Sequence, residues 1–345
     1  MKNLLFFTSP IGLGHATRDV AIASRLAKHA AIVFVSGEGA SRLIGDYGFE
    51  VKDLYRHEGF EVDEDGELKH TLRWLMSYWS YYKKCKAIAE NVIRKSRPEL
   101  IVSDEDFASI AVAQELGIPN VVITDVLQTN FIKGSLSLIE KKMNKVMRQI
   151  IDDSDLVIIP GEGDDHDKTA YVGPIVRDID SDRQALRKRF GFNSKTILVS
   201  VGGTNSGRFL INKAVETYSK IKDVIDAEMI LVSGPSLKMD VRQEGIKYIE
   251  YARNLHEMIY ACDLLISLAG RSTIDEALVY GTPAIFIPIK KHFEQEENAK
   301  RYGFRFDDIY RLEELILEKL NGDRSGMAIR NGADRASSLI LNLLT

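Results

Sequence analysis

Residues 263–283 read Asp-Leu-Leu-Ile-Ser-Leu-Ala-Gly-Arg-Ser-Thr-Ile-Asp-Glu-Ala-Leu-Val-Tyr-Gly-Thr-Pro. The apolar run at 263–268 predicts a buried strand, and residues 272–280 predict a helix that ends at Gly281, a residue favoured after helix C-termini. Gly270 lies between the two elements. A strand that runs through glycine into a helix is the repeating unit of a parallel sheet, so this stretch indicates an α/β fold.

The same alternation of strand and helix runs outward from this stretch through most of the chain. Further strands are predicted at 2–8, 32–35, 49–55, 100–103, 120–124, 196–201, 228–233, 247–251 and 284–289. Further helices are predicted at 15–30, 41–47, 68–95, 107–116, 255–261 and 294–302. Near-continuous apolar strands between helices are typical of parallel sheets that are covered on both faces.

Two successive series of this kind predict two Rossmann-like, doubly wound domains. The length of 345 residues agrees, because a domain has roughly 150 residues. Proline and glycine interrupt the pattern between residues 160 and 177, which marks the boundary. We therefore expect an N-terminal domain over 1–160, a C-terminal domain over 161–322, and a final helix over 323–345 that packs back on the N-terminal domain.

Composition excludes several classes of protein. The chain is 45% hydrophobic and 28% charged, as globular proteins are, and its net charge of -4 argues against a strongly basic nucleic-acid binder. Its two cysteines, Cys85 and Cys262, are too few for a disulfide framework or a cysteine zinc site. The apolar run 4–7 is too short for a signal peptide, and no apolar run is long enough to span a bilayer. We expect a cytoplasmic protein.

The first turn between strand and helix carries a candidate base. Residues 9–15 read Ser-Pro-Ile-Gly-Leu-Gly-His, and Gly12 and Gly14 permit a tight turn that a ligand can approach closely. His15 lies where the strand ends, at the sheet edge at which open α/β sheets bind ligands. A histidine there can act as a general base, or it can cap the helix.

Two further glycine segments suit an anion held by backbone N–H groups. Residues 201–207 read Val-Gly-Gly-Thr-Asn-Ser-Gly, with Gly202, Gly203 and Thr204 directly after a strand; an ordinary turn is the alternative. The second segment is Gly270 to Ser272, where Arg271 can add a charge-assisted contact. Glu276 follows within the helix, either as a ribose ligand or as a solvated residue. Polar side chains after the strand at 284–289 include Gln295 and Asn298, which suit sugar hydroxyls.

In this order, these segments resemble a family 28-like group of GT-B glycosyltransferases. That group contains the bacterial peptidoglycan UDP-N-acetylglucosamine transferase and its archaeal and eukaryotic lipid-linked-oligosaccharide relatives. The resemblance covers nearly the whole chain. Residues 270–283 fit the pattern G-x-S-T-x-x-E-A-x-x-x-G-x-P, with Gln and Asn following, and residues 171–177 resemble the segment between the two domains of that group.

The resemblance implies a fold and a role for each matching residue. It implies two Rossmann-like domains facing across a cleft, with His15 and Gly14 beside the acceptor and His15 as the base. The donor-binding residues that it implies are Gly12, Gly14, Arg177, Gly202, Gly203, Thr204, Leu255, Gly270, Arg271, Ser272, Glu276, Gln295 and Asn298. Among these, Arg177 and Leu255 lie by the uracil, Glu276 holds the ribose, and Gln295 and Asn298 approach the sugar.

The implied reaction is an inverting transfer of a hexose, such as GlcNAc, from a UDP-sugar to an acceptor hydroxyl. The UDP-sugar is a co-substrate; no other cofactor and no metal is expected, since fixed N–H dipoles and Arg271 can stabilise the leaving diphosphate. Asp104, Glu105 and Asp106 follow the strand at 100–103, and one of them either orients His15 or caps the next helix. We name Asp104 and Asp106 as catalytic candidates.

The sequence leaves the acceptor open. Residues 12–18 read G-x-G-H-x-x-R, which resembles a nucleotide-sugar hydrolase branch more than the peptidoglycan enzyme. Arg271 stands where the family usually has a small residue. A hydrolase or a non-catalytic nucleotide-sugar-binding subunit are the alternatives. The predicted helix with Trp74 and Trp79 has lysines beside aromatic residues, which suits peripheral contact with the cytoplasmic face of a membrane and a lipid-linked acceptor. The alternative is that these aromatic side chains face the core.

Overall fold

A computed structural model describes residues 2–57, 59–131, 137–203, 205–322, 324 and 329–344. Its contacts divide the chain into two compact units. Unit 1 comprises Met1–Glu58, His70–Val176 and Arg330–Thr345, and unit 2 comprises Gly59–Lys69 and Arg177–Ile329. The chain therefore passes between the units more often than a simple succession of two domains requires.

The described residues of unit 1 form a seven-stranded parallel sheet in the order β3-β2-β1-β6-β7-β8-β9. Its strands are β1 (Lys2–Thr8), β2 (Ala30–Ser36), β3 (Glu50–Asp53), β6 (Leu100–Asp104), β7 (Asn120–Ile123), β8 (Leu156–Ile159) and β9 (Thr169–Tyr171). The winding direction reverses between β1 and β6. Ligands of doubly wound sheets bind at the carboxyl ends of the strands at such a reversal.

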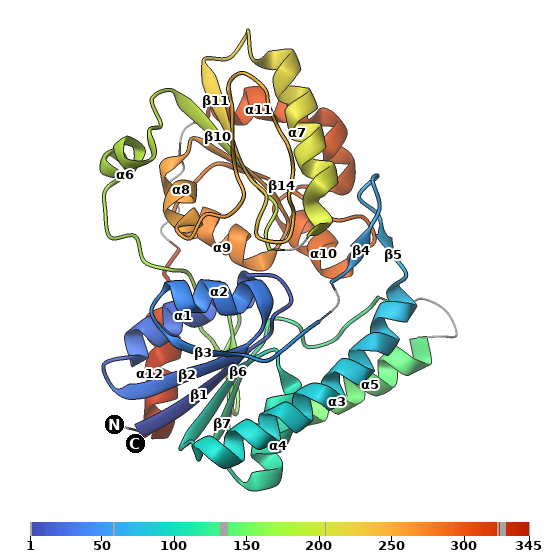
Figure 1. The fold of residues 1–345 in the computed structure, drawn as a ribbon, viewed down its shortest axis with the longest axis vertical. Coiled ribbons are helices and arrows are strands. Elements are labelled where there is room, and N and C mark those ends of the chain that lie inside the picture. The colour runs from blue at the N-terminus through green and yellow to red at the C-terminus, as the bar shows by residue number, and fades with distance from the viewer. Residues whose placement is uncertain are drawn as a thin grey trace. The chain divides into compact units, whose positions relative to one another are not determined.

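Helices cover both faces of this sheet, as Figure 1 shows. Along β1, Leu4 and Phe6 pack into one apolar cluster, and Leu5 and Phe7 pack into the other. The first cluster includes side chains of α1 (Gly14–Leu26), α2 (Glu38–Asp46) and α12 (Ala333–Leu344), and the second includes those of α3 (Thr71–Ser96), α4 (Phe107–Leu116) and α5 (Ser137–Asp152). This double coverage explains why β1 is apolar at consecutive positions.

The described residues of unit 2 form a five-stranded parallel sheet in the order β12-β11-β10-β13-β14. Its strands are β10 (Lys195–Ser200), β11 (Ala227–Val232), β12 (Ile246–Ile249), β13 (Leu264–Leu268) and β14 (Ala284–Ile287). Its helices are α6 (Arg183–Phe190), α7 (Arg208–Ile221), α8 (Leu255–Ala261), α9 (Arg271–Val279), α10 (Phe293–Arg301) and α11 (Leu312–Leu320), with short 3-10 turns η1 (Asn205–Gly207) and η2 (Phe306–Arg311). Here the winding reverses between β10 and β13.

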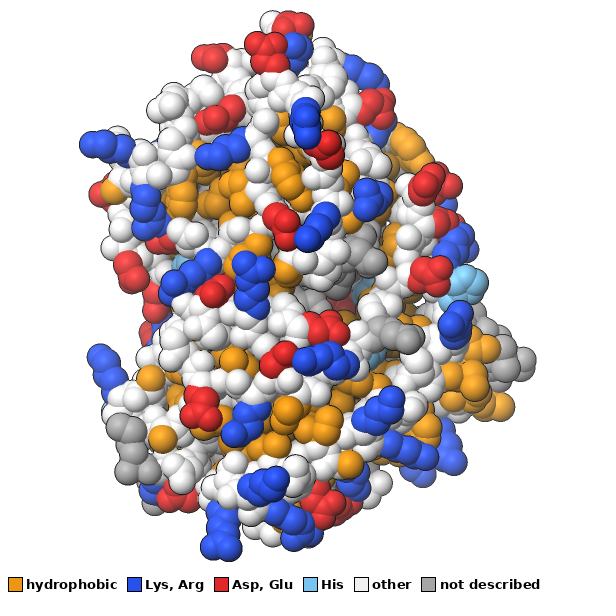
Figure 2. Space-filling model, in the orientation of Figure 1, with side chains coloured by type: hydrophobic (Ala, Val, Ile, Leu, Met, Phe, Trp, Pro, Cys, Tyr) orange, Lys and Arg blue, Asp and Glu red, His pale blue; other side chains and the backbone are white. Residues whose placement is uncertain are grey.

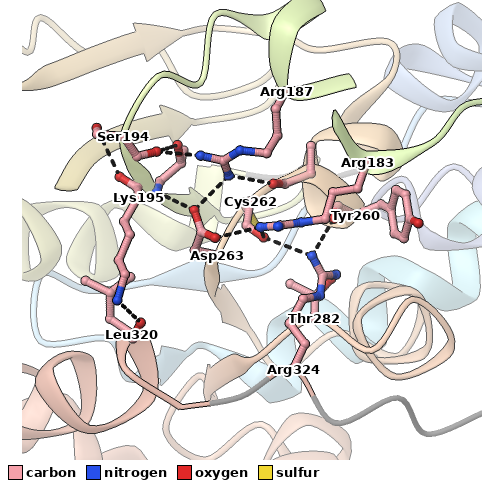
Figure 3. A network of polar contacts seen from close by, with 12 residues as sticks. Arg183, Arg187, Ser194, Lys195, Tyr260, Cys262, Asp263, Thr282, Leu320 and Arg324 are labelled. Atoms are coloured by element: carbon pink, nitrogen blue, oxygen red, sulfur yellow. Dashed lines mark hydrogen bonds and ion pairs between the residues drawn. The ribbon is translucent and has the colours of Figure 1, made fainter. Parts of the chain in front are cut away.

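A polar network lies at the amino end of the strands in unit 2, opposite to their carboxyl edge (Figure 3). Asp263 precedes β13, and its carboxylate accepts hydrogen bonds from Arg183 at 2.6 Å and Arg187 at 2.8 Å. Arg324 donates to the Tyr260 carbonyl at 2.7 Å and to Thr282 Oγ1 at 2.6 Å. These bonds fasten α6 and the segment at Arg324 to the sheet.

A short hairpin from the first half of the sequence belongs to unit 2. It consists of β4 (Glu61–Val62) and β5 (Leu68–Lys69), which pair antiparallel. The predicted helix at 68–95 is therefore too long at its start, because Leu68 donates its N–H to the Lys290 carbonyl and the helix begins at Thr71. The predicted helix at 15–30 is too long at its end for a similar reason: Ala30 opens β2 and pairs with β1.

The two cysteines are distributed one to each unit and both are buried. Cys85 packs with the α3 side of the unit 1 core, and Cys262 is the C-cap residue of α8. On the face seen in Figure 2, positive and negative side chains are interspersed, in keeping with the small net charge.

Candidate active site

The carboxyl edge of the unit 1 sheet brings four segments together at the reversal point. β1 ends at Thr8, β6 ends at Asp104 and pairs with β1, and β7 pairs with β6. The turn after β1 passes through Gly12, whose φ of 78° favours glycine, and α1 starts at Gly14. His15 thus stands in the first turn of α1, directly above the ends of neighbouring strands.

The His15 ring is held between two carboxylates. Its Nδ1 lies 2.9 Å from Asp104 Oδ1, and its Nε2 lies 3.7 Å from Glu105 Oε2. The bond at Nδ1 fixes the ring so that Nε2 is the nitrogen that can accept a proton, as in other histidine–carboxylate pairs. The His15 side chain is 17% exposed, while Asp104 is fully buried.

Arg18 anchors this pair from the next turn of α1. Its guanidinium contacts both oxygens of Asp104, with Nη2 2.6 Å from Oδ1, and its Nη1 lies 2.9 Å from Asp125 Oδ2. The fork of an arginine matches a carboxylate in this way and fixes its orientation. Asp125 lies just after the end of β7, as Asp104 lies at the end of β6, and this similar position is the signal by which the sequence could have identified it.

The network shifts the pKa of each member. Burial lowers the pKa of His15, but the charge and hydrogen bond of Asp104, with the charge of Glu105, outweigh it and raise the pKa to about 9. Burial tends to raise the pKa of Asp104, yet the charges of Arg18 and His15 hold it below its usual range. Burial, and then the charge of Asp125, raises the pKa of Glu105 to about 8. His15 is therefore a strong base that neutral solution keeps largely protonated.

Asp106, the other predicted catalytic carboxylate, lies elsewhere. It precedes α4, and its Oδ2 accepts a hydrogen bond from Tyr55 Oη at 2.8 Å, among buried side chains on the α3 side of the sheet. The structure therefore brings His15 together with Asp104, Glu105 and Asp125, and it engages Asp106 with Tyr55.

In unit 2, the double-glycine loop follows β10 at the equivalent edge. Gly202 has a φ of 80°, and an added Cβ at Gly234, after β11, would lie 1.9 Å from the Gly202 carbonyl oxygen. The loops after these two strands are thus in backbone contact, which glycine alone permits. Gly203 follows in the same loop, and Thr204 lies outside the described residues.

The N-terminus of α9 lies after the neighbouring strand β13. Gly270 is its N-cap residue, in an extended conformation, and Arg271 and Ser272 form its first turn. The first N–H groups of a helix make a site for anions. The Arg271 side chain, however, pairs along the helix with Asp275, with 3.0 Å between Nε and Oδ1, so in this structure it is held by its own helix.

Glu276 and Arg177 form a buried ion pair, which joins two residues that the sequence predicted as separate ligands. Arg177 Nη2 and Nε lie 2.7 Å and 3.1 Å from Glu276 Oε1. Both side chains are buried, with exposed fractions of 4% and 5%. The Tyr280 hydroxyl donates to the Arg177 carbonyl at 2.7 Å. Arg177 Nη1 also approaches the Arg253 carbonyl, two residues before Leu255, where α8 begins.

Gln295 and Asn298 extend from α10 to the ends of two strands. Gln295 Oε1 accepts the Ile289 N–H at 3.1 Å, after β14, and Asn298 Nδ2 donates to the Ala269 carbonyl at 3.4 Å, after β13. Both side chains therefore lie at the same edge as Gly202 and Gly270. Over the part of the chain that the structure describes, no group of three or more His, Cys, Asp or Glu residues is arranged to hold a metal ion.

Comparison with protein families identifies the unit 2 sheet. The family model described as the glycosyltransferase family 28 C-terminal domain matches residues 196–320. This segment is a family 28 domain. It contains β10 to α11, and hence the double-glycine loop, the α9 N-terminus, and Gln295 and Asn298.

Relatives match a larger share of the chain than the family model does. An uncharacterized glycosyltransferase of Methanopyrus kandleri is 30% identical over 61% of this chain and 62% of its own length. The UDP-N-acetylglucosamine--N-acetylmuramyl-(pentapeptide) pyrophosphoryl-undecaprenol N-acetylglucosamine transferase of Staphylococcus carnosus is 28% identical over 62% of this chain and 59% of its own length. The match thus spans about three fifths of each of these two relatives.

Solved structures confirm the fold prediction. The crystal structure of the glycotransferase of kitacinnamycin has a TM-score of 0.69 over 100% of this chain and 99% of its own, at 15% sequence identity. The two parallel sheets are those of the GT-B fold, and the segment at 196–320 matches the C-terminal domain of glycosyltransferase family 28.

Proposed function

We propose that this protein is an inverting glycosyltransferase that moves a hexose from a UDP-sugar to an acceptor hydroxyl without a metal ion. The observation that carries the proposal is the His15–Asp104 pair, 2.9 Å apart, at the sheet edge of a chain that contains a family 28 domain. UDP-GlcNAc is the donor that we infer, because the Staphylococcus carnosus relative is named for it.

In the proposed reaction, Nε2 of neutral His15 accepts the proton of the acceptor hydroxyl. The freed oxygen forms a bond to the anomeric carbon from the face opposite to the diphosphate. The bond from that carbon to the diphosphate oxygen breaks, and its electron pair leaves with UDP. Asp104 stabilises the imidazolium that results, and Arg18 keeps Asp104 ionised and oriented.

Unit 2 supplies the donor contacts in this proposal. The N–H groups of the loop at Gly202 and of the first turn of α9 stabilise the charge that develops on the leaving diphosphate. Glu276 holds the ribose through its second carboxylate oxygen, since Arg177 contacts Oε1 and fixes the orientation of the carboxylate. Gln295 and Asn298 contact the hexose.

We propose further that the acceptor is linked to a lipid and that α3 meets the membrane surface. None of the described helices is long and apolar enough to cross a bilayer. On α3, Met76 and Trp79 are 63% and 46% exposed, and the Lys83 ammonium lies 5.4 Å from the Trp79 ring centre. Trp74, by contrast, packs against His57 and Tyr78. An exposed aromatic residue beside lysine suits the interface of an anionic membrane.

Product analysis tests the reaction. The protein is incubated with UDP-GlcNAc, with and without a polyprenyl-pyrophosphate-linked saccharide, and UDP and glycosylated product are measured. Transfer to the saccharide with inverted configuration supports the proposal. UDP release at the same rate without the saccharide makes the protein a hydrolase, and no UDP release under either condition refutes the enzymatic proposal.

Vesicle flotation tests the membrane contact. Trp79→Ala should reduce binding to vesicles that contain anionic lipid. Tyr310→Ala is the matched control, because Tyr310 is an exposed aromatic residue, 71% accessible, in unit 2. Equal flotation of wild type and Trp79→Ala would count against α3 as the contact.

A further inference from the structure

The hairpin of β4 and β5 reaches into the part of unit 2 that binds the donor. We propose that residues 59–69 are a positioning element of the donor site, which sets the spacing between the loop at 202–207 and the loop at 288–292. This inference rests on the function proposed above, since it assigns donor contacts to those two loops. It adds a segment from the first half of the sequence, outside residues 196–320, to the binding of the UDP-sugar.

The hairpin supports the first loop through two contacts. Ser206, which is buried, donates its hydroxyl to the Phe60 carbonyl at 3.3 Å. Gly66 lies against the ring of Phe209, at the start of α7, so closely that a Cβ on Gly66 would be 2.8 Å from the ring. Gly66 also has a φ of 76°, so the hairpin turn requires glycine for two reasons.

The second loop is held by the hairpin backbone. Leu68 donates its N–H to the Lys290 carbonyl at 3.0 Å, and Lys290 donates its own to the Gly66 carbonyl at 2.8 Å. Glu67 and Lys291 add an ion pair of 2.5 Å. Lys291 has a φ of 66°, which few residues other than glycine adopt, and these bonds hold it there.

Phe60 reaches the sugar side of the donor site through His292. The two rings meet edge to face with 5.0 Å between their centres. His292 caps α10 by accepting the Gln295 N–H at its Nδ1, and it can do so because burial lowers its pKa to about 4 and keeps it neutral. Phe60 therefore supports the His292 cap at the start of α10, the helix that carries Gln295, which our proposal places on the hexose.

The hairpin is stiff enough for this task. The Asp63 carboxylate accepts the N–H groups of Asp65 at 3.1 Å and Glu67 at 2.8 Å, and it pairs with the Lys69 ammonium at 2.9 Å. Side chains that bond to the backbone of their own turn fix its conformation. These bonds therefore fix the position of Phe60, at one end of the hairpin, relative to Gly66 at the other end.

The two ends predict different effects on affinity, which separates positioning from a general loss of structure. Phe60→Ala should weaken UDP-GlcNAc about three- to tenfold, the range of an edge-to-face ring contact, and leave UDP alone nearly unaffected. Gly66→Ala should weaken both ligands, because it displaces Phe209 and the loop at Ser206. Phe60→Tyr keeps the ring and should restore affinity. Glu64→Ala is the control, since Glu64 is an exposed residue of the same hairpin.

Calorimetric titration of each full-length variant with UDP and with UDP-GlcNAc decides the matter. Selective loss of UDP-GlcNAc in Phe60→Ala, with recovery in Phe60→Tyr, supports the proposal. If Phe60→Ala and Gly66→Ala bind both ligands as tightly as wild type does, the hairpin role is overturned and the proposed function is not. Wild type that binds neither ligand overturns the proposed function and the hairpin role with it.

Hydrogen exchange provides a measurement that needs no variant. Binding of UDP-GlcNAc to wild type should slow exchange of the Leu68 and Lys290 amides more than that of the Leu186 amide in α6, which belongs to the same unit. Equal changes at all three amides would contradict the proposal.

Discussion

The carboxyl edges of the two sheets have the same topology and opposite chemistry. In unit 1 the edge gathers ionisable side chains, with Arg18 and His15 among Asp104, Glu105 and Asp125. In unit 2 the edge is built of glycine turns and a helix N-terminus, with the Arg177–Glu276 pair sealed beneath. A proton transfer needs a side chain of tuned pKa, whereas a diphosphate can be held by backbone N–H groups. The difference teaches that the same sheet edge takes on different chemistry when the residues at the ends of its strands change.

The largest effect is expected from His15→Ala. Removal of a general base typically lowers the rate by about a hundred- to ten-thousandfold. Since our proposal places the UDP contacts in unit 2, the dissociation constant for UDP should stay unchanged. His29→Ala is the control, because His29 is an exposed histidine near the end of α1. Steady-state kinetics and calorimetric titration check both points. Full turnover of His15→Ala would contradict the assignment of the general base to the edge of the unit 1 sheet.

Arg177→Met tests the buried ion pair of unit 2. It leaves the Glu276 carboxylate buried without its partner, which typically costs about 3 to 5 kcal/mol of unfolding free energy. Denaturant unfolding measures this loss. Arg242→Met serves as control, because the Arg242–Asp240 pair is 87% and 75% exposed and contributes little. A loss below about 1 kcal/mol for Arg177→Met would show that Glu276 is held by other contacts.

The pH profile sharpens the assignment in unit 1. Only neutral His15 accepts a proton, so kcat/KM should rise with pH up to an apparent pKa of about 9. In Asp104→Asn the charge that raises this pKa is gone and burial still lowers it, so the rise should move to lower pH by more than about one unit. A rise that stays in place would separate Asp104 from His15.

The same pKa shift predicts how stability depends on pH. The folded protein binds the His15 proton more tightly than the unfolded chain, so this contribution is complete below the ordinary histidine pKa of about 6.5. It is then lost as the pH rises towards 9. Thermal unfolding between these pH values should show a decline in wild type that is smaller in His15→Ala; equal declines would contradict it.

The smallest effects concern the glycine turns. Gly202→Ala meets no neighbour within 4 Å, so its cost is the left-handed backbone alone, about 1 to 2 kcal/mol. Gly234→Ala adds a collision with the Gly202 carbonyl and should lower stability and UDP affinity further. Thermal shift with and without UDP compares the two variants. Equal losses of stability and of UDP affinity in the two variants would show that the loops can move apart at little energetic cost.

The sequence predicted those elements of the structure that short, local residue patterns determine. Apolar runs and glycine caps predicted the central strands of both sheets and the helices between them, and the position of His15 after β1 followed from sheet topology. The edge strands β8 and β9 and the helices α5, α6, α7 and α11 were not predicted. The hairpin was not predicted, because β4 and β5 have only two residues each and the hairpin is bonded to Lys290, which is distant in the sequence. The Arg177–Glu276 pair escaped for a related reason: the two residues lie 99 positions apart, and no local pattern joins them.

The distribution of cysteines gives each unit its own chemical reporter. Burial raises the pKa of both thiols, Cys85 and Cys262, to about 12, so neither forms the reactive thiolate while its unit stays folded. Alkylation of Cys85 then requires unit 1 to open, and alkylation of Cys262 requires unit 2 to open. The native chain therefore permits the opening rates of its two halves to be timed separately by mass spectrometry, without a single introduced label.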